Sequence, residues 1–253
     1  MKICRVEIAP EKIEYGIVIE GEVFGLQGEK DSAKLGTRLG KLEDLKLRSP
    51  VVPGKVIGVG LNYKDHAQEM KQKLPDDPIL FIKPKSSVIG PGEPIMLPPS
   101  SQRVDYEAEL GVVIYRPARD VSVESAKEYI LGYTCVNDVS ARDLQVKDGQ
   151  WTRAKGFDSF CPIGPWVETE VDPSNLRIEG RLNGKVVQKS NTNNLNFNCF
   201  QLVSFISKVM TLEPGDVIAT GTPSGIGPMK DGDEIVVWIE GVGELKNPVA
   251  AAK

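Results

Sequence analysis

The stretch "VDYEAELGVVI", residues 104–114, alternates polar and apolar residues in the manner of a β-strand with one buried face. Because successive side chains of a strand point to opposite faces, Asp105, Glu107 and Glu109 share one face. The opposite face is expected to pack in the core, and it carries Tyr106, Ala108, Leu110, Val112 and Ile114. Two glutamates on one face of a core strand require a physical reason.

The carboxylates of these two glutamates repel each other. Same-face neighbours on a strand lie about 7 Å apart. At an effective dielectric constant of about 20, two carboxylates at that separation repel by about 2.4 kcal/mol. Water would screen the repulsion on a solvated face, whereas a cation held between Glu107 and Glu109 would turn it into attraction. The stretch alone leaves both interpretations open.

The composition is that of a soluble globular protein, and 253 residues suffice for one large domain or for a small domain and a larger one. The 35 acidic and 31 basic residues are well mixed, and without a basic run we expect neither a nucleic-acid nor a membrane partner. The N-terminus lacks the apolar segment of a signal peptide, and no stretch approaches the roughly 18 apolar residues of a membrane span. We therefore expect a cytoplasmic protein.

The cysteines and the histidine argue against a zinc site. Cys4, Cys135, Cys161 and Cys199 lie far apart without a CxxC pair, which favours free thiols over disulfides. His66 is the only histidine. Closely spaced Cys or His ligands, which zinc prefers, are therefore missing from the sequence.

The first fifty residues predict a small N-terminal α+β subdomain. Three short stretches alternate like strands: "CRVEI", "EYGIVI" and "EVFGL". Four leucines at helical spacing predict a short amphipathic helix: Leu35, Leu39, Leu42 and Leu45. Pro50 and Pro53 then interrupt the pattern. We place the boundary there, with a subdomain of residues 1–52 and a catalytic domain of residues 53–253.

Strand patterns dominate beyond residue 54, and they predict a β-rich α+β fold. Asn183-Gly184 between two such patterns predicts a tight β-hairpin. One helix is predicted in "SVESAKEYILGY", with Ser122 as its N-cap and Gly132 as its C-terminal stop. A second helix is predicted in "CFQLVSFISKVM", before the Pro214-Gly215 turn.

Two glycine-rich stretches resemble nucleotide-binding loops only in part. "GVGLNY" has Tyr63 where a dinucleotide-binding loop has its third glycine, and the surrounding βαβ unit is missing. "GTPSGIG", residues 221–227, is not followed by the Gly-Lys-Ser/Thr of a phosphate-binding loop. Neither stretch predicts a nucleotide site.

Asp138 offers a third carboxylate to Glu107 and Glu109. It follows an apolar strand pattern, where an acid can also serve as a turn former or a helix cap. Three hard oxygen donors without a nearby imidazole or thiolate suit Mg²⁺, Mn²⁺ or Ca²⁺.

His66 and Glu69 form a candidate acid–base pair, because side chains at i and i+3 of a short helix can meet. Lys155 lies among aromatic residues, as either a surface lysine or a buried cation with a partner. Arg142 and Gln145 follow Asp138 by about one helical turn and could present a guanidinium and an amide to a ligand. The alternative for Arg142 is a salt bridge to Asp143 or Asp148.

Six stretches occur in the order and spacing of the fumarylacetoacetate hydrolase family, which the sequence resembles from about residue 55 to residue 250. They are "GVGLNYKDHAQEM", "PILFIKPKSSVIGPG", "VDYEAELGVVI", "NDVSARDLQ", "WTRAKGFDSFCPIGP" and "IATGTPSGIGP". "NYKDHAQEM" looks most like the short branch that contains acylpyruvases, oxaloacetate decarboxylases and 2-hydroxyhepta-2,4-diene-1,7-dioate isomerase-like proteins. Fumarylacetoacetate itself is not the expected substrate.

The resemblance implies a roll of mixed β-sheets, a homodimer and a bound divalent cation, Mg²⁺ with Mn²⁺ or Ca²⁺ as alternatives. Carried over by position, the metal ligands would be Glu107, Glu109 and Asp138. The pair His66 and Glu69 would lie on a lid that becomes ordered over the substrate. The residues lining the substrate would be Lys155, Arg142, Gln145 and Thr222.

The resemblance also implies an enzyme of small 2-oxo carboxylic acids. The metal and Lys155 would stabilise an enolate, while His66, oriented by Glu69, would activate water or move protons. We expect C–C bond cleavage, by acylpyruvate-type hydrolysis or oxaloacetate-type decarboxylation. An isomerase or tautomerase of a 2-hydroxydienoate dicarboxylate is the alternative, which a further basic residue at the distal end of the pocket would favour. A metal-stabilised binding protein without turnover would not need the His66–Glu69 pair.

Overall fold

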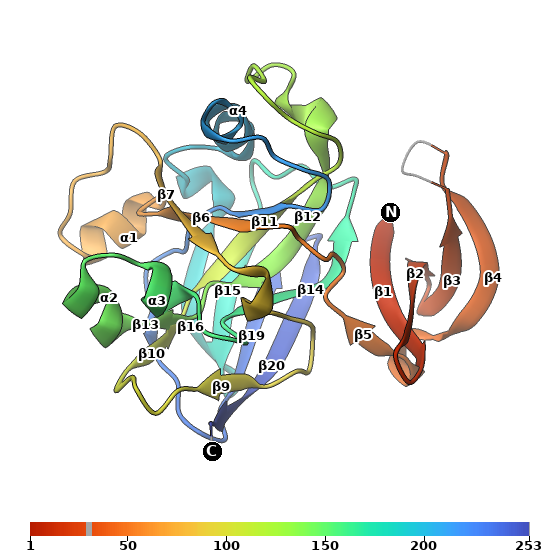
Figure 1. Cartoon of the computed structure of the whole chain (residues 1–253), viewed down its shortest axis with the longest axis horizontal. Coiled ribbons are helices and arrows are strands. Elements are labelled where there is room, and N and C mark those ends of the chain that lie inside the picture. Colours follow the sequence, from red (N-terminus) through yellow and green to blue (C-terminus); the bar gives the residue numbers. More distant parts are fainter. Residues whose placement is uncertain (29–31, 253) are drawn as a thin grey trace.

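The computed structural model of the chain describes residues 1–28 and 32–252 (Figure 1). Strands dominate it and build three sheets, which confirms the β-rich α+β fold expected from the sequence. In this part of the chain, no helix is both long and apolar enough to cross a lipid bilayer.

The largest sheet has twelve strands in the main order β4-β3-β2-β1-β14-β12-β11-β17-β6-β7, with β5 beside β1 and β8 beside β14. Its strands are β1 (Lys2–Ala9), β2 (Lys12–Ile19), β3 (Glu22–Gln27), β4 (Lys34–Lys41), β5 (Lys46–Arg48), β6 (Val56–Gly60), β7 (Ile79–Lys83), β8 (Val88–Ile89), β11 (Ala108–Ile114), β12 (Ile130–Asn137), β14 (Cys161–Glu168) and β17 (Val217–Ala219).

The two smaller sheets lie beside the central strands of the largest one. A five-stranded sheet has the order β16-β15-β19-β20-β9, and its members are β9 (Ile95–Leu97), β15 (Arg177–Leu182), β16 (Lys185–Asn191), β19 (Glu234–Ile239) and β20 (Gly243–Ala251). A three-stranded sheet joins β10 (Val104–Tyr106), β13 (Ser140–Ala141) and β18 (Gly227–Pro228).

The helices are short and lie around the sheets. The α-helices are α1 (Lys64–Glu69), α2 (Arg142–Asp148), α3 (Thr152–Lys155) and α4 (Cys199–Val209). Single 3₁₀ turns are η2 (Leu42–Asp44), η3 (Lys85–Ser87), η4 (Ala126–Tyr129) and η5 (Thr192–Asn194).

The N-terminal strands extend the large sheet to one side, at the right of Figure 1. The connection is narrow, since β1 pairs with β14 only at Lys2 opposite Glu168 and Ile3 opposite Val167. The N-terminal ammonium adds an ion pair with Glu168 at 2.8 Å. The division of the chain at residue 52 stays a prediction.

The helix predicted from the four leucines is wrong. Leu35 and Leu39 belong to β4, and Leu42 and Leu45 lie at and after the turn η2. Glycines weaken a helix, and Gly36 lies so close to β3 that a Cβ there would approach Gly25 O to 2.9 Å. Strand pairing therefore prevails, although Leu39, Leu42 and Leu45 do pack on a small apolar cluster of Cys4, Val6 and Val23.

The helix predicted from Ser122 to Gly132 is also wrong. Only the 3₁₀ turn η4 forms, and the chain then enters β12, which pairs with β11 on one side and β14 on the other. Gly132 does not stop a helix. It allows close approach of the neighbouring strand, because a Cβ there would lie 2.4 Å from Glu168 O. Two strand partners outweigh the local helical pattern.

The predicted hairpin and the second predicted helix are confirmed. Asn183 and Gly184 both have positive φ, 51° and 77°, as the tight turn between β15 and β16 requires. Helix α4 packs Leu202 and Ile206 into the largest core cluster, together with Leu110 of β11 and residues of β15 and β19. This core holds β11 and β12 at the centre of the molecule.

The N-terminus of α4 carries a capping box, which gives a test of the helix. Asn198 Oδ1 accepts hydrogen bonds from the N–H groups of Phe200 and Gln201, both at 3.0 Å, and Gln201 Oε1 accepts one from Asn198 N–H. Asn198→Ala should lower the free energy of unfolding by about 0.5–2 kcal/mol, measured by urea denaturation. Asn198→Ser keeps an acceptor and should restore most of that loss. Equal losses in both variants would contradict a capping role.

Candidate active site

Glu107 lies where the chain passes from one sheet to another. Strand β10 ends at Tyr106 and pairs with β13 and β18, whereas β11 begins at Ala108 and pairs with β12 and β17. Between them, Glu107 N–H donates to Asn137 Oδ1 at 3.0 Å, and Glu107 O accepts from Asp138 N–H at 2.9 Å. The backbone thus places Asp138, just after β12, directly beside Glu107.

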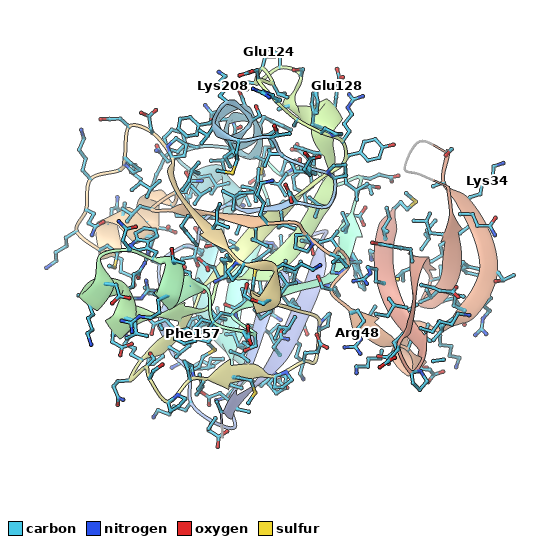
Figure 2. The ribbon with its side chains drawn as sticks, in the orientation of Figure 1. Lys34, Arg48, Glu124, Glu128, Phe157 and Lys208 are labelled. Atoms are coloured by element: carbon cyan, nitrogen blue, oxygen red, sulfur yellow. The ribbon has the colours of Figure 1, made fainter. Side chains whose placement is uncertain are left out.

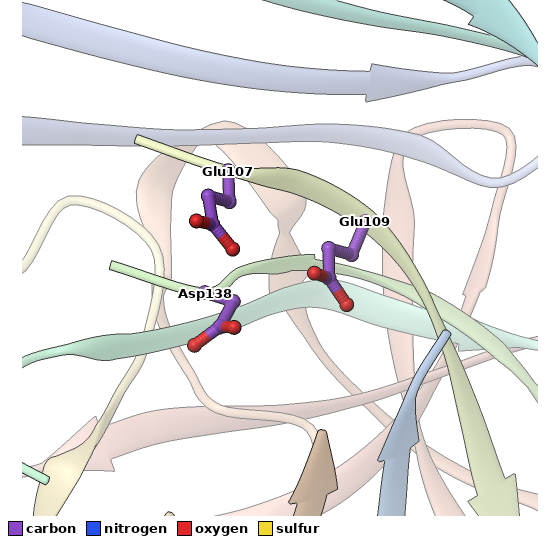
Figure 3. A group of neighbouring side chains, drawn as sticks. All are labelled: Glu107, Glu109 and Asp138. Atoms are coloured by element: carbon purple, nitrogen blue, oxygen red, sulfur yellow. The ribbon is translucent and has the colours of Figure 1, made fainter. Parts of the chain in front are cut away.

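Glu107, Glu109 and Asp138 converge on one point (Figure 3). Each offers a carboxylate oxygen, and these oxygens all lie within 4.8 Å of one another. The three residues are only 5%, 1% and 1% exposed. The interpretation of a solvated face is therefore wrong, because water cannot screen the repulsion there.

One oxygen of each carboxylate is held by a neighbouring donor. Arg142 Nη2 donates to Glu107 Oε1, Lys83 Nζ to Asp138 Oδ1 at 2.6 Å, and Gly221 N–H to Glu109 Oε2 at 2.8 Å. The second oxygen of each carboxylate can therefore bind a positively charged group at the centre of the triad.

Lys155, at the end of α3, supplies a cation at this centre. Its Nζ donates to Glu107 Oε2 at 2.9 Å and to Asp138 Oδ2 at 2.5 Å. The ammonium also lies 4.9 Å from the centroid of the Phe81 ring. The sequence left open whether Lys155 is a surface lysine or a buried, paired cation, and the structure places it buried and paired.

The electrostatics differ between the carboxylates. Burial raises the pKa of Glu109 well above its usual range, and the charges of Asp138 and Glu107 raise it further. Burial also raises the pKa of Glu107, but the charges of Lys155 and Arg142 outweigh that effect and hold this pKa well below its usual range. Among the described residues, no lysine or arginine pairs with Glu109. Glu109 is therefore the carboxylate that most needs a further positive charge.

These residues fit a divalent metal ion. Three carboxylates provide the hard oxygen ligands that Mg²⁺, Mn²⁺ and Ca²⁺ prefer. A divalent ion would supply Glu109 with the positive charge it lacks, and it would offset the mutual repulsion of the group. The donor set is chemically suited to these three ions without selecting one of them.

Arg142 is fixed by three acceptors. It donates through Nε to Asp105 Oδ2 at 3.0 Å, through Nη1 to Gln145 Oε1 at 2.6 Å and through Nη2 to Glu107. The alternative of a salt bridge to Asp143 or Asp148 is wrong. Asp143 accepts from Ser101 and Gln102 instead, and Asp148 pairs with Arg153.

His66 and Glu69 meet on α1 as their spacing predicts. The distance from His66 Nδ1 to Glu69 Oε2 is 3.1 Å, and Glu69 also accepts from Gly225 N–H at 3.0 Å. Asp65 adds a second contact of α1 with the body of the protein, because its Oδ2 accepts from Ser190 Oγ at 2.6 Å. The helix is thereby docked with His66 buried.

The carboxylates, Lys155 and His66 line the same cavity of about 240 Å³. Arg142, Gln145 and Thr222 line it as well, so the structure brings every residue assigned to the site by resemblance to one place, apart from Glu69, which lies behind His66. The remaining wall is mostly apolar: Val59, Leu61, Met70, Phe81, Val146 and Trp151. The lysine and arginine residues in the described lining are Lys155 and Arg142, and both contact the carboxylates.

Thr222 lines the cavity and also forms hydrogen bonds that hold the neighbouring backbone in place. Its hydroxyl donates to Ala108 O and accepts from Gln188 Nε2, both at 2.9 Å. Gln188 Oε1 in turn accepts from Ala108 N–H at 2.9 Å. Gln188 of β16, which the sequence did not single out, thus fixes the start of β11 against the loop after β17.

Lys83 is the main site residue that the sequence reasoning missed. It is 0% exposed and donates both to Asp138 Oδ1 and, at 3.1 Å, to Val139 O. A lysine that ends the apolar stretch "ILFIK" could have been flagged as a buried cation in need of an acid. Its partner lies 55 residues away along the chain, a pairing that no local pattern reveals.

The fold and the site together define a class of protein: a β-rich roll with a buried triad of carboxylates suited to a divalent ion, opening on a cavity with a histidine–glutamate pair. Residues 55–250 match the family described as Fumarylacetoacetate (FAA) hydrolase C-terminal. The chain belongs to the fumarylacetoacetate hydrolase family, which confirms the resemblance of the six motifs.

Relatives of this chain carry several activities in their names. The mitochondrial oxaloacetate tautomerase Fahd2a of Rattus norvegicus is 45% identical over 208 residues, 78% of this chain and 66% of that protein. The structure of 5-carboxymethyl-2-hydroxymuconate delta-isomerase from Mycobacterium smegmatis has 44% identity and a TM-score of 0.91, with 100% of both chains covered. Maleylpyruvate hydrolase from Sphingobium sp. SYK-6, solved with manganese(II) and pyruvate, has 30% identity and a TM-score of 0.84, also with 100% of both chains covered.

The metal assignment predicts a ligand-dependent gain in stability. At about 100 times the dissociation constant, Mg²⁺ or Mn²⁺ should raise the melting temperature of the protein by about 5–10 °C. Glu109→Gln removes the charge that the ion would neutralise and should abolish the shift. Its metal-free form should be at least as stable as the metal-free wild type, because a neutral amide does not repel its neighbours.

A matched control is Glu128→Gln, a surface position away from the site (Figure 2). Glu128 is 67% exposed and pairs only with Arg116 among the described salt bridges. This variant should keep the full metal-dependent shift. A full shift in Glu109→Gln would contradict the assignment of the site.

The segment of residues 64–77, which comprises α1 with His66 and Glu69 and the residues after it, is predicted to act as a lid. Residues 70–73 are exposed, whereas Met70 and Gln72 also line the cavity, so a bound ligand would contact them. Amide exchange across residues 64–77 should therefore slow when oxalate and Mg²⁺ are added. The exposed hairpin at residues 183–184 should exchange equally in both conditions. If the rates of amide exchange across residues 64–77 were the same with and without oxalate and Mg²⁺, the prediction of a lid would be wrong.

Proposed function

We propose that this protein is a divalent-metal-dependent enzyme that converts small 2-oxo carboxylic acids through an enolate. The observation that carries the proposal is the convergence of the carboxylate triad, Lys155 and His66 on one cavity. Its volume of about 240 Å³ lies below the usual range of ligand pockets, roughly 300–1,000 Å³, and suits a small acid.

The charges of the site favour a short dicarboxylic acid. Three cations already lie at the triad, where Lys83, Lys155 and Arg142 pair with Glu107 and Asp138 and balance the charge of three carboxylates. A divalent ion would therefore leave the site with excess positive charge. Arg142 uses three of its five N–H donors on protein groups and keeps two for a second substrate carboxylate. The described lining of the cavity holds no lysine or arginine beyond Arg142 and Lys155 for a distant second carboxylate, which argues against a long dienedioate.

The chain's own residues can manage both the charge and the proton of enolisation. A divalent ion in the triad would supply a Lewis acid for the 2-oxo group. Lys155 places an ammonium where negative charge develops on the substrate oxygen. Glu69 engages Nδ1 of His66, which leaves Nε2 as the atom that removes or returns a proton at the neighbouring carbon.

Among the reactions that share this enolate, we propose keto–enol tautomerisation of an oxaloacetate-like acid. It moves one proton between the carbon and the 2-oxo oxygen: His66 would take the proton from the carbon, the Lys155 ammonium would give one to the enolate oxygen, and the proton on His66 would then pass to Lys155 directly or through solvent. The tautomerase from Rattus norvegicus and the isomerase from Mycobacterium smegmatis support this choice. The reaction differs from the C–C cleavage that the sequence reasoning favoured, whereas an oxaloacetate-like substrate is one of those that this reasoning named.

C–C bond cleavage is the second candidate. The His66–Glu69 pair could also activate a water molecule, and the maleylpyruvate hydrolase of the same fold supports that use. The two candidates differ in whether pyruvate is released.

We also propose Mg²⁺ as the ion, with Mn²⁺ or Ca²⁺ as alternatives, and a cytoplasmic homodimer.

The test is a substrate panel of oxaloacetate, acylpyruvates and 2-hydroxydienoates. With Mg²⁺, and not with EDTA, the enol absorbance of oxaloacetate should decay faster than in buffer, while a coupled assay detects no pyruvate. Pyruvate formed at the same rate would establish cleavage or decarboxylation instead. No metal-dependent turnover of any panel member would overturn the proposed function.

The mechanism predicts a separation of binding from turnover. His66→Ala should lower kcat by roughly 10²–10⁴. Its affinity for oxalate at saturating Mg²⁺ should change little, because oxalate resembles an enolate and needs no proton transfer. Lys155→Ala should lower both kcat and the affinity for oxalate, since it removes a cation beside the developing negative charge.

Glu69→Gln serves as the graded comparison. This variant keeps the imidazole but removes the negative charge of the Glu69 carboxylate that faces His66 Nδ1. Its loss of kcat should therefore be smaller than that of His66→Ala. Calorimetric titration of oxalate measures binding in all three variants. If His66→Ala lost as much oxalate affinity as Lys155→Ala, His66 would be a binding residue and the proposed role would fail.

A further inference from the structure

The two buried lysines of the site hold Asp138 in different ways. Lys83 donates to Asp138 Oδ1 and also to the backbone carbonyl of Val139, and it is the buried last residue of the edge strand β7. Lys155 donates only to carboxylates, Glu107 Oε2 and Asp138 Oδ2, among its described bonds. Lys83 is anchored to the scaffold, whereas Lys155 is anchored to the proposed metal ligands alone.

The oxygens that Lys155 uses are those that a metal ion would use. Arg142, Lys83 and the Gly221 N–H each hold the outer oxygen of one carboxylate. Glu107 Oε2 and Asp138 Oδ2 are thus not used by these three donors, and each of the three carboxylates offers one oxygen to a common centre. Lys155 Nζ contacts Glu107 Oε2 at 2.9 Å and Asp138 Oδ2 at 2.5 Å.

We propose that Lys155 is a built-in placeholder for the metal, which the ion displaces from the carboxylates into the substrate cavity. The inference rests on the metal site of the proposed function. A buried carboxylate group without a cation would be strongly destabilised, and Lys155 prevents this in the metal-free protein. When the ion takes over Glu107 Oε2 and Asp138 Oδ2, the ammonium loses both acceptors and is repelled by the ion.

The surroundings offer the displaced ammonium a place. Lys155 lines the cavity, and its Nζ already lies 4.9 Å from the centroid of the Phe81 ring, within cation–π range. The Phe81 ring is itself supported by Trp151 at a centroid distance of 5.3 Å. Metal loading would thus both complete the ligand shell and free Lys155 for the substrate oxygen, so the enzyme becomes competent in one step.

The first test is residue-resolved lysine labelling of the wild-type protein. Reductive methylation after removal of metal with EDTA, read by mass spectrometry, is compared with the same reaction in saturating Mg²⁺ or Mn²⁺. Labelling of Lys155 should rise several-fold with metal. Lys83 should stay unlabelled in both states, and the exposed Lys85 should be labelled equally in both. Labelling of Lys155 that stays constant or falls with metal would overturn the proposal.

The second test is metal affinity by titration calorimetry. Lys155→Met removes the competing cation and should bind Mg²⁺ roughly tenfold more tightly than the wild type. The matched control Lys85→Met, outside the cavity, should bind as the wild type does. Equal or weaker binding by Lys155→Met would contradict displacement. If the wild type binds neither Mg²⁺ nor Mn²⁺, the proposed function fails together with this inference; if metal binds but Lys155 does not respond, only this inference fails.

Discussion

Three carboxylates buried within 4.8 Å of one another repel strongly, and the structure around them is arranged to offset that repulsion. The chain breaks its strand at Glu107, where it changes sheets, and it ends β12 just before Asp138. It buries Lys83 and Lys155 beside Asp138, although a buried lysine is costly unless paired. Each group would destabilise the core alone. Together the carboxylates and the lysines can be buried, because their opposite charges offset one another. The residues of the site therefore depend on one another electrostatically.

The sheet order explains how the unit is assembled from distant parts of the chain. Strands β11 and β12 are direct neighbours, and β17 places the loop that begins at Gly221 beside Glu109. That glycine-rich loop lacks the Gly-Lys-Ser/Thr sequence of a phosphate-binding loop. Its N–H groups instead serve two carboxylates, Glu109 through Gly221 and Glu69 through Gly225. The same loop thus connects the carboxylate triad with the helix that carries His66.

Periodic patterns in the sequence predicted which nearby side chains lie together, whereas contacts between residues far apart along the chain were missed. The alternation around Glu107 revealed the acidic face, and the i, i+3 spacing revealed the pair of His66 and Glu69, because both relations are local. The contact of Lys83 with Asp138 spans 55 residues and has no local signature. The two wrong helices failed for the same reason: the leucines near β4 and the stretch before Gly132 have helical spacing, but strand partners supplied by other segments prevail.

One enolate-forming site can support isomerases, tautomerases and hydrolases because the reactions diverge only after the enolate exists. What separates them is the fate of the proton on His66 and the access of water to the cavity. In this structure α1 is docked by two carboxylates, Glu69 on Gly225 and Asp65 on Ser190, and the walls near Phe81 and Trp151 are apolar. The cavity has a volume of only about 240 Å³, which leaves little room for a hydrolytic water beside a bound acid. Under the proposed tautomerase function, the docking of this short helix is the feature that would favour returning the proton over breaking the bond.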